Sequence, residues 1–475
     1  MAEALHLVGG SIACLVAALR AGQHGRPVTL HADPARLGAS FAGIMLEGRR
    51  LNLGIRVFEL EHEAAGDQPV PGCDLARDDH LPFLGSIRAL VEEVLGEELV
   101  RAAAPEMWLE GRRAPCVLTN ADIAALPPLL DPARRSRIAR EAAALLEAPS
   151  PPPCRFRPGH PAGAVRAALE ETPLEEASLA NHGATLHGLL IPAVAARLDP
   201  GWASRVAAAR RKLWLALFHP RTVLEAFRGE TPGFRPHRPF WGMRGGVSAV
   251  FVERLLTLLT ALPSVRINPV GRLRHMASGP RGTVLLDFAA PPGGAPQRLS
   301  LPAATCALGL GAEELFRAAG VDYAPQRLSV AFGWAEVAEA DLRHCPFSLL
   351  LAAPGAPALR VSAGPVAEGG RRVMALEFGH VPEGLPHPGA AEARRALEET
   401  GLLREGAPMR LLGVTSLPCL QVPSFDNRRA FQAALAAFHA RGPEGWAGQL
   451  LCGAGRLGFD SMNEQILTGL RIGEP

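Results

Sequence analysis

The sequence contains almost no lysine and almost no tyrosine. Lys212 is the only lysine among 49 lysine and arginine residues, and Tyr323 is the only tyrosine. A mechanism built on a lysine nucleophile or a Schiff base is therefore disfavoured. The 47 acidic residues almost balance the basic ones, which leaves a net charge of +2 at pH 7. No overall field attracts nucleic acid or an acidic membrane, and we expect no nucleic-acid partner.

Paired cysteines and long apolar runs are also missing. The eight cysteines form no C-x-x-C motif and no Cys/His pairing at zinc spacing, so we expect free thiols and no metal site. They are residues 14, 73, 116, 154, 306, 345, 419 and 452. No apolar run reaches the roughly 18 residues of a membrane-spanning helix. The first ten residues lack the basic region of a signal peptide, so we expect a cytoplasmic protein.

The length and composition predict a globular chain with more than one core. A chain of 475 residues exceeds the size that one ordinary core supports. Hydrophobic residues make up 48% of the sequence and charged residues 20%, which is typical of a folded protein. We therefore expect two domains, with segments that can interleave along the chain.

The first part of the chain has the order of a mononucleotide-binding unit. An apolar strand over residues 5–8 leads into a tight turn over 9–11, an apolar helix over 12–21 and a second strand over 27–31. In such a βαβ unit, the turn directs backbone N–H groups and the positive end of the helix dipole at a pyrophosphate. The turn is therefore the predicted centre of a binding site.

The dinucleotide fingerprint in this turn is degenerate. It requires glycine at three positions, and the chain offers Gly9, Ser11 and Cys14. Ser11 adds a hydroxyl where the phosphate comes closest. The acidic residue that holds a ribose hydroxyl is replaced by Ala32. Asp33 follows, but its side chain faces the opposite side of a strand unless the chain has already turned.

Residues 35–58, ARLGASFAGIMLEGRRLNLGIRVF, resemble a segment of several flavoprotein families. These are the FAD-dependent amine oxidases, protoporphyrinogen oxidases, phytoene desaturases and UDP-galactopyranose mutases, in which an arginine and two glycines meet the pyrophosphate. Arg36 and Gly38 match, whereas Ala39 replaces the second glycine. Residues 52–54 are similar to the Asp-x-Gly motif of these families, with asparagine in place of the aspartate.

Two later segments continue the resemblance in the same order along the chain. Residues 244–246 with 265–270 resemble the Gly-Gly helix and the strand on the adenine side, and residues 453–473 resemble the flavin-contacting start of the last helix. The resemblance implies an α/β fold in which a Rossmann-like FAD-type domain is joined by a discontinuous helical and β-sheet substrate domain. The implied division is 1–80, 236–310 and 440–475 for the FAD-type domain, 81–235 for a mostly helical substrate or cap domain, and 311–439 for its β-rich part.

The resemblance also implies a site for noncovalent FAD. Its pyrophosphate would lie over the N–H groups of residues 10–12, and its flavin end near Arg456 and Met462. Because the fingerprint is degenerate, we expect weaker binding than in relatives with all three glycines. The residues expected to contact the cofactor are Gly9, Gly10, Ser11, Ile12, Asp33, Arg36, Gly38, Arg49, Gly54, Val270, Gly455, Arg456 and Met462.

Three functions remain open from the sequence. The first is an FAD-dependent oxidoreductase in which flavin accepts a hydride from a small, largely apolar substrate; such an enzyme needs no strong acid/base motif, and no catalytic residue is assigned. The second is an accessory protein that keeps the fold without catalysis or with an altered cofactor. The third is a flavin-dependent mutase, against which the shortage of tyrosine argues. The sequence identifies no surface for a partner protein or a homo-oligomer.

Local patterns predict several elements beyond these motifs. Helices are expected over residues 84–104, 132–147, 247–262, 390–402 and 428–441, with a helical block over 163–230. A hairpin is expected over 105–118, with its turn at residues 110–112. Short β-rich runs follow at 282–289, 328–334, 348–352, 358–363 and 371–378. His182, His187 and His219 are interpreted as packing or hydrogen-bonding residues rather than catalysts.

Overall fold

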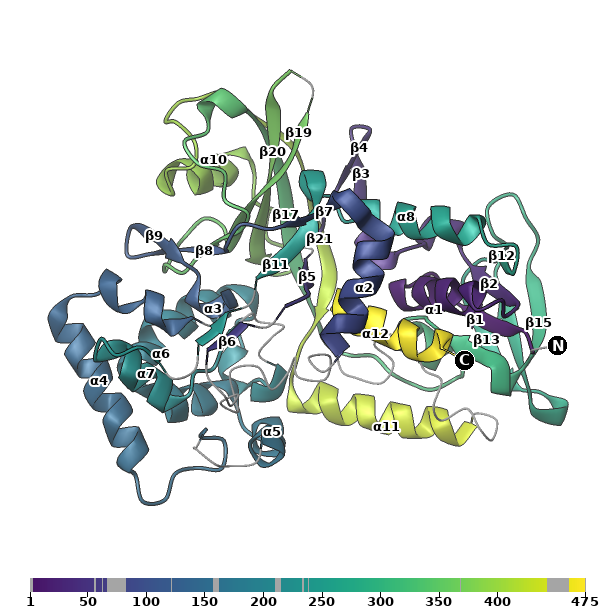
Figure 1. Ribbon diagram of the computed structural model, residues 1–475, viewed down its shortest axis with the longest axis horizontal. Helices are drawn as coiled ribbons and strands as arrows, with labels where there is room; N and C mark the ends of the chain where they lie inside the picture. The colour runs from purple at the N-terminus through teal and green to yellow at the C-terminus, as the bar shows by residue number, and fades with distance from the viewer. Residues whose placement is uncertain are drawn as a thin grey trace.

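In the computed structural model, the chain folds into three bodies (Figure 1). A parallel sheet with its helices lies on the right of the view, a helical block on the left, and a large, mostly antiparallel sheet at the top. The structure describes residues 3–54, 57–61, 63–65, 83–120, 122–156, 162–209, 215–232, 235–237, 239–367, 369–441 and 461–474.

A four-stranded parallel sheet forms the centre of the first body. Its order is β12-β2-β1-β16, so β1 pairs with β2 on one side and β16 on the other. Leu5 and Leu7 pack on the side of helix α1, whereas Val8 packs on the opposite side. The bounds are β1 Leu5–Val8, β2 Val28–Ala32, β12 Val265–Pro269 and β16 Cys306–Leu308. The predicted α/β, Rossmann-like fold class is confirmed.

Helix α1 is buried on nearly all sides. Ten of the 12 residues of Ile12–Gln23 are buried, because the sheet covers one face and other helices cover the rest. Gly469 and Gly473 bring α12 against α1 at very short range. The neighbouring helices are α2 Leu84–Leu95, α8 Ala249–Thr260 and α12 Met462–Gly473. Helix α2 thus shares a core with α1, although its residues lie in the range assigned to the substrate domain from the sequence.

Replacing Gly469 by Ala should destabilise the fold by about 1–3 kcal/mol, because there is no room for a methyl group. A Cβ at Gly469 would lie 2.6 Å from the carbonyl oxygen of Ala13 and 2.7 Å from Cβ of Val16. Gly188 on α6 (Leu174–Leu198) is the matched control, since a Cβ there meets nothing within 4 Å. Gly188→Ala should stabilise the helix by up to about 1 kcal/mol. Urea unfolding measures both changes, and equal effects would contradict the packing.

The opposite face of the parallel sheet is covered by a three-stranded antiparallel sheet and two helices. Tyr323 lies in this core, with its ring centre 5.3 Å from that of Phe316 and 5.9 Å from that of Phe431. The single tyrosine is therefore a packing residue. The elements are β13 Leu273–Ser278, β14 Thr283–Phe288, β15 Gln297–Pro302, α9 Ala312–Ala318 and α11 Phe425–Arg441.

The second body is a seven-stranded sheet of order β21-β17-β20-β19-β18-β8-β9. Helix α10 (Ala390–Glu399) packs on one face, and the hairpin of β3 (Ile44–Leu46) and β4 (Arg49–Leu51) packs on the other. The strands are β8 Glu106–Leu109, β9 Arg112–Pro115, β17 Arg327–Ala338, β18 Leu349–Leu351, β19 Arg360–Ala367, β20 Arg371–His380 and β21 Met409–Gln421.

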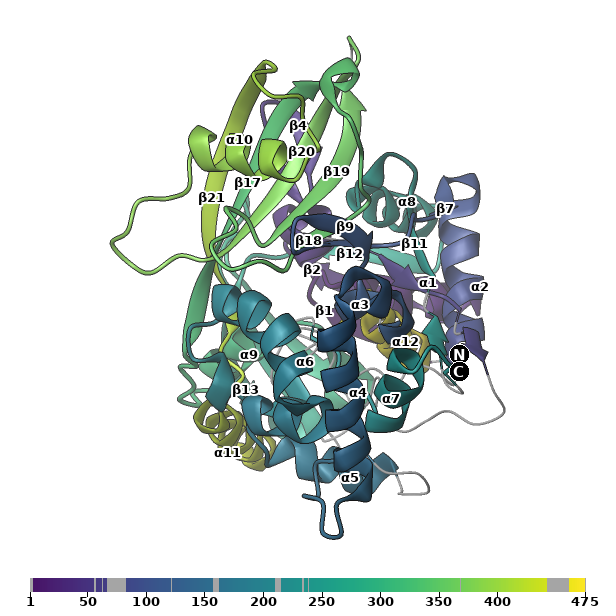
Figure 2. The same cartoon turned by 90° about the vertical axis from the view of Figure 1, so that its left-hand side faces the viewer.

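The helical block packs around a separate apolar core, seen from its own side in Figure 2. Its longest helix, α6, is kinked at Gly183, which has a φ of +76°. The helices are α3 Val117–Asn120, α4 Pro132–Glu147, α5 Ala162–Glu170, α6 and α7 Pro220–Phe227. Short strands link the bodies: β5 Phe58–Glu59, β6 Glu63–Ala65, β7 Leu99–Arg101, β10 Arg235–His237 and β11 Phe240–Met243.

The three histidines of this block have structural partners. Ser178 Oγ lies 3.0 Å from His182 Nδ1 and 2.9 Å from His187 Nδ1, and all three side chains are buried. The backbone N–H of Phe218 donates to His182 Nε2. His219 Nδ1 accepts from the backbone N–H of residue 221 and caps α7. The interpretation of these histidines as packing and hydrogen-bonding residues is confirmed.

Most of the local predictions are confirmed, with one clear exception. Helix α4 covers residues 132–147 as expected, and the hairpin turns at Glu110 and Gly111. The expected helix over 84–104 is wrong beyond Leu95. Gly96 has a φ of +51° and ends α2, after which β7 begins at Leu99. A left-handed glycine is a common helix terminator, and it separates these two elements.

Candidate functional site

A pocket opens at the carboxyl ends of the parallel strands. In sheets of this kind, ligands bind where the strand order reverses, and here β1 has its successor β2 on one side and the later strand β16 on the other. The cavity has a volume of about 80 Å³. It is lined by Val8, Gly9, Gly10, Ser11, His31, Ala32, Asp33, Arg36, Ala39, Val270, Gly271, Leu273, Phe288, Gly309, Leu310, Gly311 and Glu314.

The turn after β1 is formed by two glycines that have no room for side chains. Gly9 has a φ of +119°, and a Cβ there would lie 2.6 Å from the carbonyl oxygen of Gly309. A Cβ at Gly10 would lie 3.0 Å from the carbonyl oxygen of Arg36. The N–H of Gly38 donates to the carbonyl of Gly10 at 2.6 Å, which fixes the Arg36 loop on the turn. The ends of β1 and β16 thus approach through backbone alone.

Ser11 caps helix α1 with its own side chain. Its Oγ accepts from the backbone N–H of Cys14 at 3.3 Å, so the hydroxyl satisfies one of the helix N–H groups. Cys14 is fully buried, and burial raises its pKa to about 12. A Cβ at Gly309 would overlap Cys14 Sγ and lie 2.7 Å from Ser11 Oγ. Gly309 therefore provides the space that the larger residues at the degenerate fingerprint positions need.

Asp33 lies in the pocket because the chain turns directly after β2. The strand ends at Ala32, and Asp33 caps the following turn, with Oδ1 accepting from the N–H of Ala35 at 3.0 Å. The turn meets the condition under which Asp33 could serve as the ribose-binding acid. Ala32 and Asp33 both line the cavity.

His31 adds a neutral imidazole to the wall of the pocket. Its Nδ1 lies 2.9 Å from Asn268 Nδ2, and its Nε2 lies 3.3 Å from His6 Nδ1. Because the Asn268 amide nitrogen can only donate, His31 accepts at Nδ1 and carries its proton on Nε2. Burial lowers the pKa of His31 to about 4, so the ring is uncharged at neutral pH.

Arg36 and Glu314 form an ion pair within the lining. Arg36 Nη1 lies 3.3 Å from Glu314 Oε1 and 3.0 Å from Oε2. The Arg36 side chain is 45% exposed and that of Glu314 is 17% exposed. Glu314 belongs to the first turn of α9, where the helix dipole favours a carboxylate. The arginine that resembles a pyrophosphate ligand therefore already has an anionic partner.

The far wall of the pocket is apolar. Val270, Leu273 and Phe288 line it, and the N–H of Val270 donates to the carbonyl of Ala32 at 3.0 Å. Val270 was expected on the adenine side from the sequence, and the structure places it beside the end of β2. The lining thus combines an apolar wall with the carboxylate of Asp33.

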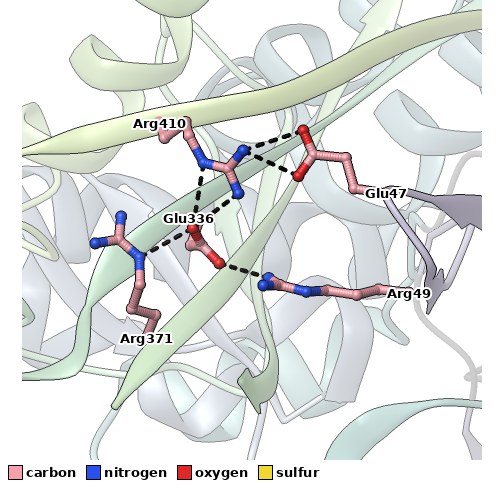
Figure 3. Close-up of polar contacts among 5 residues, drawn as sticks. All are labelled: Glu47, Arg49, Glu336, Arg371 and Arg410. Atoms are coloured by element: carbon pink, nitrogen blue, oxygen red, sulfur yellow. Dashed lines mark hydrogen bonds and ion pairs between the residues drawn. The ribbon is translucent and has the colours of Figure 1, made fainter. Parts of the chain in front are cut away.

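Arg49 lies in a different cluster, shown in Figure 3. Its Nη1 donates to Glu336 Oε1 at 2.5 Å. Glu336 Oε2 is also 2.9 Å from Arg371 Nε and 3.1 Å from Arg410 Nη2. The hydrogen bond from Arg49, together with those from Arg410 and Arg371, lowers the pKa of the buried Glu336 to about 2. Arg410 also pairs with Glu47, so the cluster joins the β3–β4 hairpin to the large sheet.

Asn52 joins two segments that resemble flavoprotein motifs. Its Oδ1 accepts from the N–H and the Oγ of Ser248, each at 2.9 Å. Its Nδ2 donates to the carbonyl of Gly246 at 2.6 Å. Gly54 has a φ of +76° and faces the large sheet, since a Cβ there would lie 3.0 Å from Glu377 Oε1. The segments around residues 52–54 and 244–248 therefore meet in space.

The structure thus brings together only part of the predicted set. Gly9, Gly10, Ser11, Asp33, Arg36 and Val270 line one pocket. Ile12 and Gly38 adjoin it through the first turn of α1 and the bond to Gly10. Arg49 and Gly54 lie elsewhere, and Met462 is buried at the start of α12. Gly455 and Arg456 lie outside the described residues.

The sequence did not lead us to expect several of the lining residues, above all His31, Gly309 and Glu314. The available signal was the short apolar strand before residues 309–311, since glycines after a strand mark a close backbone approach. Nothing in the sequence shows that this strand lies beside β1. Among the described residues, no cluster of three metal-ligating side chains occurs, and no helix has the length and apolarity of a membrane crossing.

Comparison with known proteins identifies the fold. No protein-family model matches the chain, and no curated protein is similar to it in sequence. A reduced UDP-galactopyranose mutase is similar in structure, with a TM-score of 0.67 and 13% identity over 100% of this chain and 95% of the other. A fatty acid isomerase from P. acnes has a TM-score of 0.54 and 13% identity, covering 99% of this chain and 98% of its own.

A putrescine oxidase is similar over 100% of this chain and 99% of its own length, with a TM-score of 0.53 and 12% identity. At these identities the likeness shows the fold alone. Mutases and amine oxidases are among the families that residues 35–58 resemble, so the expected resemblance is confirmed at the level of the fold.

Proposed function

We propose that this protein is a flavoprotein oxidoreductase that binds FAD noncovalently, with the ADP half of the cofactor in the pocket at the ends of β1, β2, β12 and β16. The observation that carries the proposal is the convergence of the Gly9–Gly10 turn, Asp33, Arg36 and Val270 on one cavity. Val270 comes from a part of the sequence far from the other residues. The glycine turn and the acidic residue after the second strand are the residue types that a dinucleotide-binding fold uses at these positions.

The residues of the pocket fit the parts of an ADP group in turn. The N–H groups of residues 10–12, at the start of α1, would face the pyrophosphate, and Arg36 would add a positive charge. The carboxylate of Asp33 would accept from a ribose hydroxyl. Val270 and Phe288 would pack on the adenine ring. The carboxylate of Glu314 lies in the same lining, has no part of the ADP group to bind, and opposes a phosphate.

The chemistry of the proposed reaction belongs to the cofactor, which accepts a hydride when it is bound. The chain's own residues would bind and orient it. We propose a small and largely apolar substrate, because few charges occur along α6 on the proposed substrate side. No catalytic side chain is assigned. Cytoplasmic location remains part of the proposal.

The visible absorbance spectrum of the purified protein tests this function. We expect the bands of oxidised flavin, either after purification or after FAD is added and excess cofactor is removed. The bands should disappear on anaerobic addition of the true substrate. A protein that stays colourless at saturating FAD would contradict the proposal.

Ser11→Gly should tighten FAD binding about fivefold, because it removes the hydroxyl from the place where the phosphate would come closest to the turn. The loss of the cap costs only a few tenths of a kcal/mol when glycine is the replacement. Asp131→Gly removes the cap of α4, far from the pocket, and is the control that should leave FAD affinity unchanged. Fluorescence titration measures both. Weaker binding by Ser11→Gly would show that the hydroxyl is itself a ligand.

An accessory protein with an altered cofactor is the second candidate. The ion pair of Glu314 with Arg36 favours it, since a carboxylate in the lining opposes a bound phosphate. A bound flavin that no substrate reduces would support this candidate over the oxidoreductase. A mutase of the UDP-galactopyranose type is not proposed, because the single tyrosine packs against Phe316 and Phe431 in a core.

A further inference from the structure

We propose that Glu314 is an internal counter-ion that holds Arg36, so that the pyrophosphate of FAD binds only when Arg36 exchanges one anionic partner for another. This inference rests on the proposed function. It assigns to Glu314 a positioning role, exerted through Arg36, that weakens the binding of the cofactor. The residue does not act on the substrate.

The geometry of the pair supports an exchange rather than a fixed structural bridge. A single guanidinium nitrogen, Arg36 Nη1, reaches both carboxylate oxygens of Glu314, at 3.3 and 3.0 Å. The arginine is 45% exposed and the glutamate 17% exposed. Partly exposed pairs of this kind contribute little to stability, so their exchange costs little. Both side chains line the pocket in which the phosphate would lie.

The charges that line the pocket explain why the ion pair between Arg36 and Glu314 would affect the binding of a phosphate. Asp33 and Glu314 carry two negative charges against the single positive charge of Arg36, and His31 is uncharged at neutral pH. A pyrophosphate adds further negative charge to this surface. Like charges at short range in a partly desolvated site disfavour binding. While Arg36 is paired with Glu314, the pocket therefore favours the uncharged nucleoside part of the ligand over its phosphates.

The neighbouring residue on the same helix turn provides a matched comparison. Glu313 precedes Glu314 in α9 and has the same charge. Its Oε1 accepts from Arg327 Nε at 2.8 Å and from Gln421 Nε2 at 3.2 Å, and it does not line the pocket. Removing the charge at 313 or at 314 changes the net charge of α9 equally. Only the change at 314 releases Arg36.

The experiment is a titration of flavin-free full-length protein with FAD, followed by flavin fluorescence. Glu314→Gln should lower the Kd for FAD by up to about fivefold, whereas Glu313→Gln should leave it unchanged. The affinity of Glu314→Gln should also fall more steeply with added salt, because its Arg36 interacts with the phosphate rather than with an internal partner. Equal affinities of wild type and Glu314→Gln would overturn the inference.

A double variant separates the action through Arg36 from direct repulsion of the phosphate. In an Arg36→Ala background, Glu314→Gln should lose most of this gain in affinity, since no guanidinium remains to be released. An undiminished gain in that background would mean that Glu314 acts on the phosphate directly, and would overturn the exchange. Circular dichroism of each variant confirms that it is folded.

Whether wild type binds FAD at all is measured in the same titration. If no variant and no wild-type protein binds FAD, the proposed function fails and the inference falls with it. If wild type binds FAD and Glu314→Gln binds it no better, only the inference fails. A gain confined to Glu314→Gln and dependent on Arg36 supports both.

Discussion

Replacing Arg36 by Glu should weaken FAD binding at least about 100-fold. The change removes the cation nearest the proposed pyrophosphate and adds a third carboxylate beside Asp33 and Glu314. At the effective dielectric of a protein surface, reversing a charge a few ångströms from a phosphate changes the binding free energy by about 3 kcal/mol. Arg36 is 45% exposed, so the fold should tolerate the change. Fluorescence titration with FAD measures the loss.

Arg317→Glu is the control for this prediction. Arg317 lies on α9, one turn after Glu314. It is exposed and does not line the pocket. The substitution Arg317→Glu changes the net charge of the protein by the same amount as Arg36→Glu. Similar losses in the two variants would attribute the effect to net charge, and an unchanged affinity in Arg36→Glu would place the phosphate elsewhere.

The second large effect is expected from Glu336→Gln, which should lower the free energy of unfolding at pH 7 by about 2 kcal/mol. Glu336 is 3% exposed and is the shared partner of Arg49, Arg371 and Arg410. Removing its charge leaves three guanidinium groups without their common anion. This expected loss of stability is smaller than the roughly 3 kcal/mol that the pKa shift alone would imply, because water screens the partly exposed arginines.

This contribution depends on pH in a definite direction. The pKa of Glu336 falls from 4.5 to about 2 on folding. Its stabilisation is therefore fully present above about pH 4.5 and is lost as the pH falls towards 2. Urea unfolding between pH 7 and pH 2.5 should show wild type and Glu336→Gln converging in acid. Glu339→Gln, which breaks an exposed pair with Arg372, is the control and should cost less than about 1 kcal/mol. A gap between wild type and Glu336→Gln that stays constant with pH would contradict the assignment.

The fold could be predicted from the sequence because several weak signals occur in the right order. The β1–α1 turn, the Arg36 loop and the strand ending near Val270 each resemble a part of the same architecture. The structure brings these segments together at one edge of the parallel sheet. A degenerate fingerprint is compatible with this fold because Gly309 makes room for Ser11 and Cys14.

The site could be predicted only where its residues lie next to a recognisable strand end. Gly309 and Glu314 were missed because their place depends on β16 pairing with β1, which no local pattern reveals. Arg49 was expected at the cofactor for its position in a motif-like segment. Its partner Glu336 lies 287 residues away, so the ion pair cannot be seen from the sequence. Whether Asp33 faces the pocket could not be decided from the sequence, because the answer depends on where β2 ends.

Titrations of the flavin-free wild-type protein with FAD and with its two halves test directly whether this pocket binds a dinucleotide. If the pocket holds the ADP half, ADP should compete with FAD, and FMN, which lacks that half, should bind far more weakly than FAD. The competition by ADP should be lost in Arg36→Glu. Binding of FMN as tight as that of FAD, without competition by ADP, would contradict the claim that this pocket at the ends of β1, β2, β12 and β16 is a dinucleotide site.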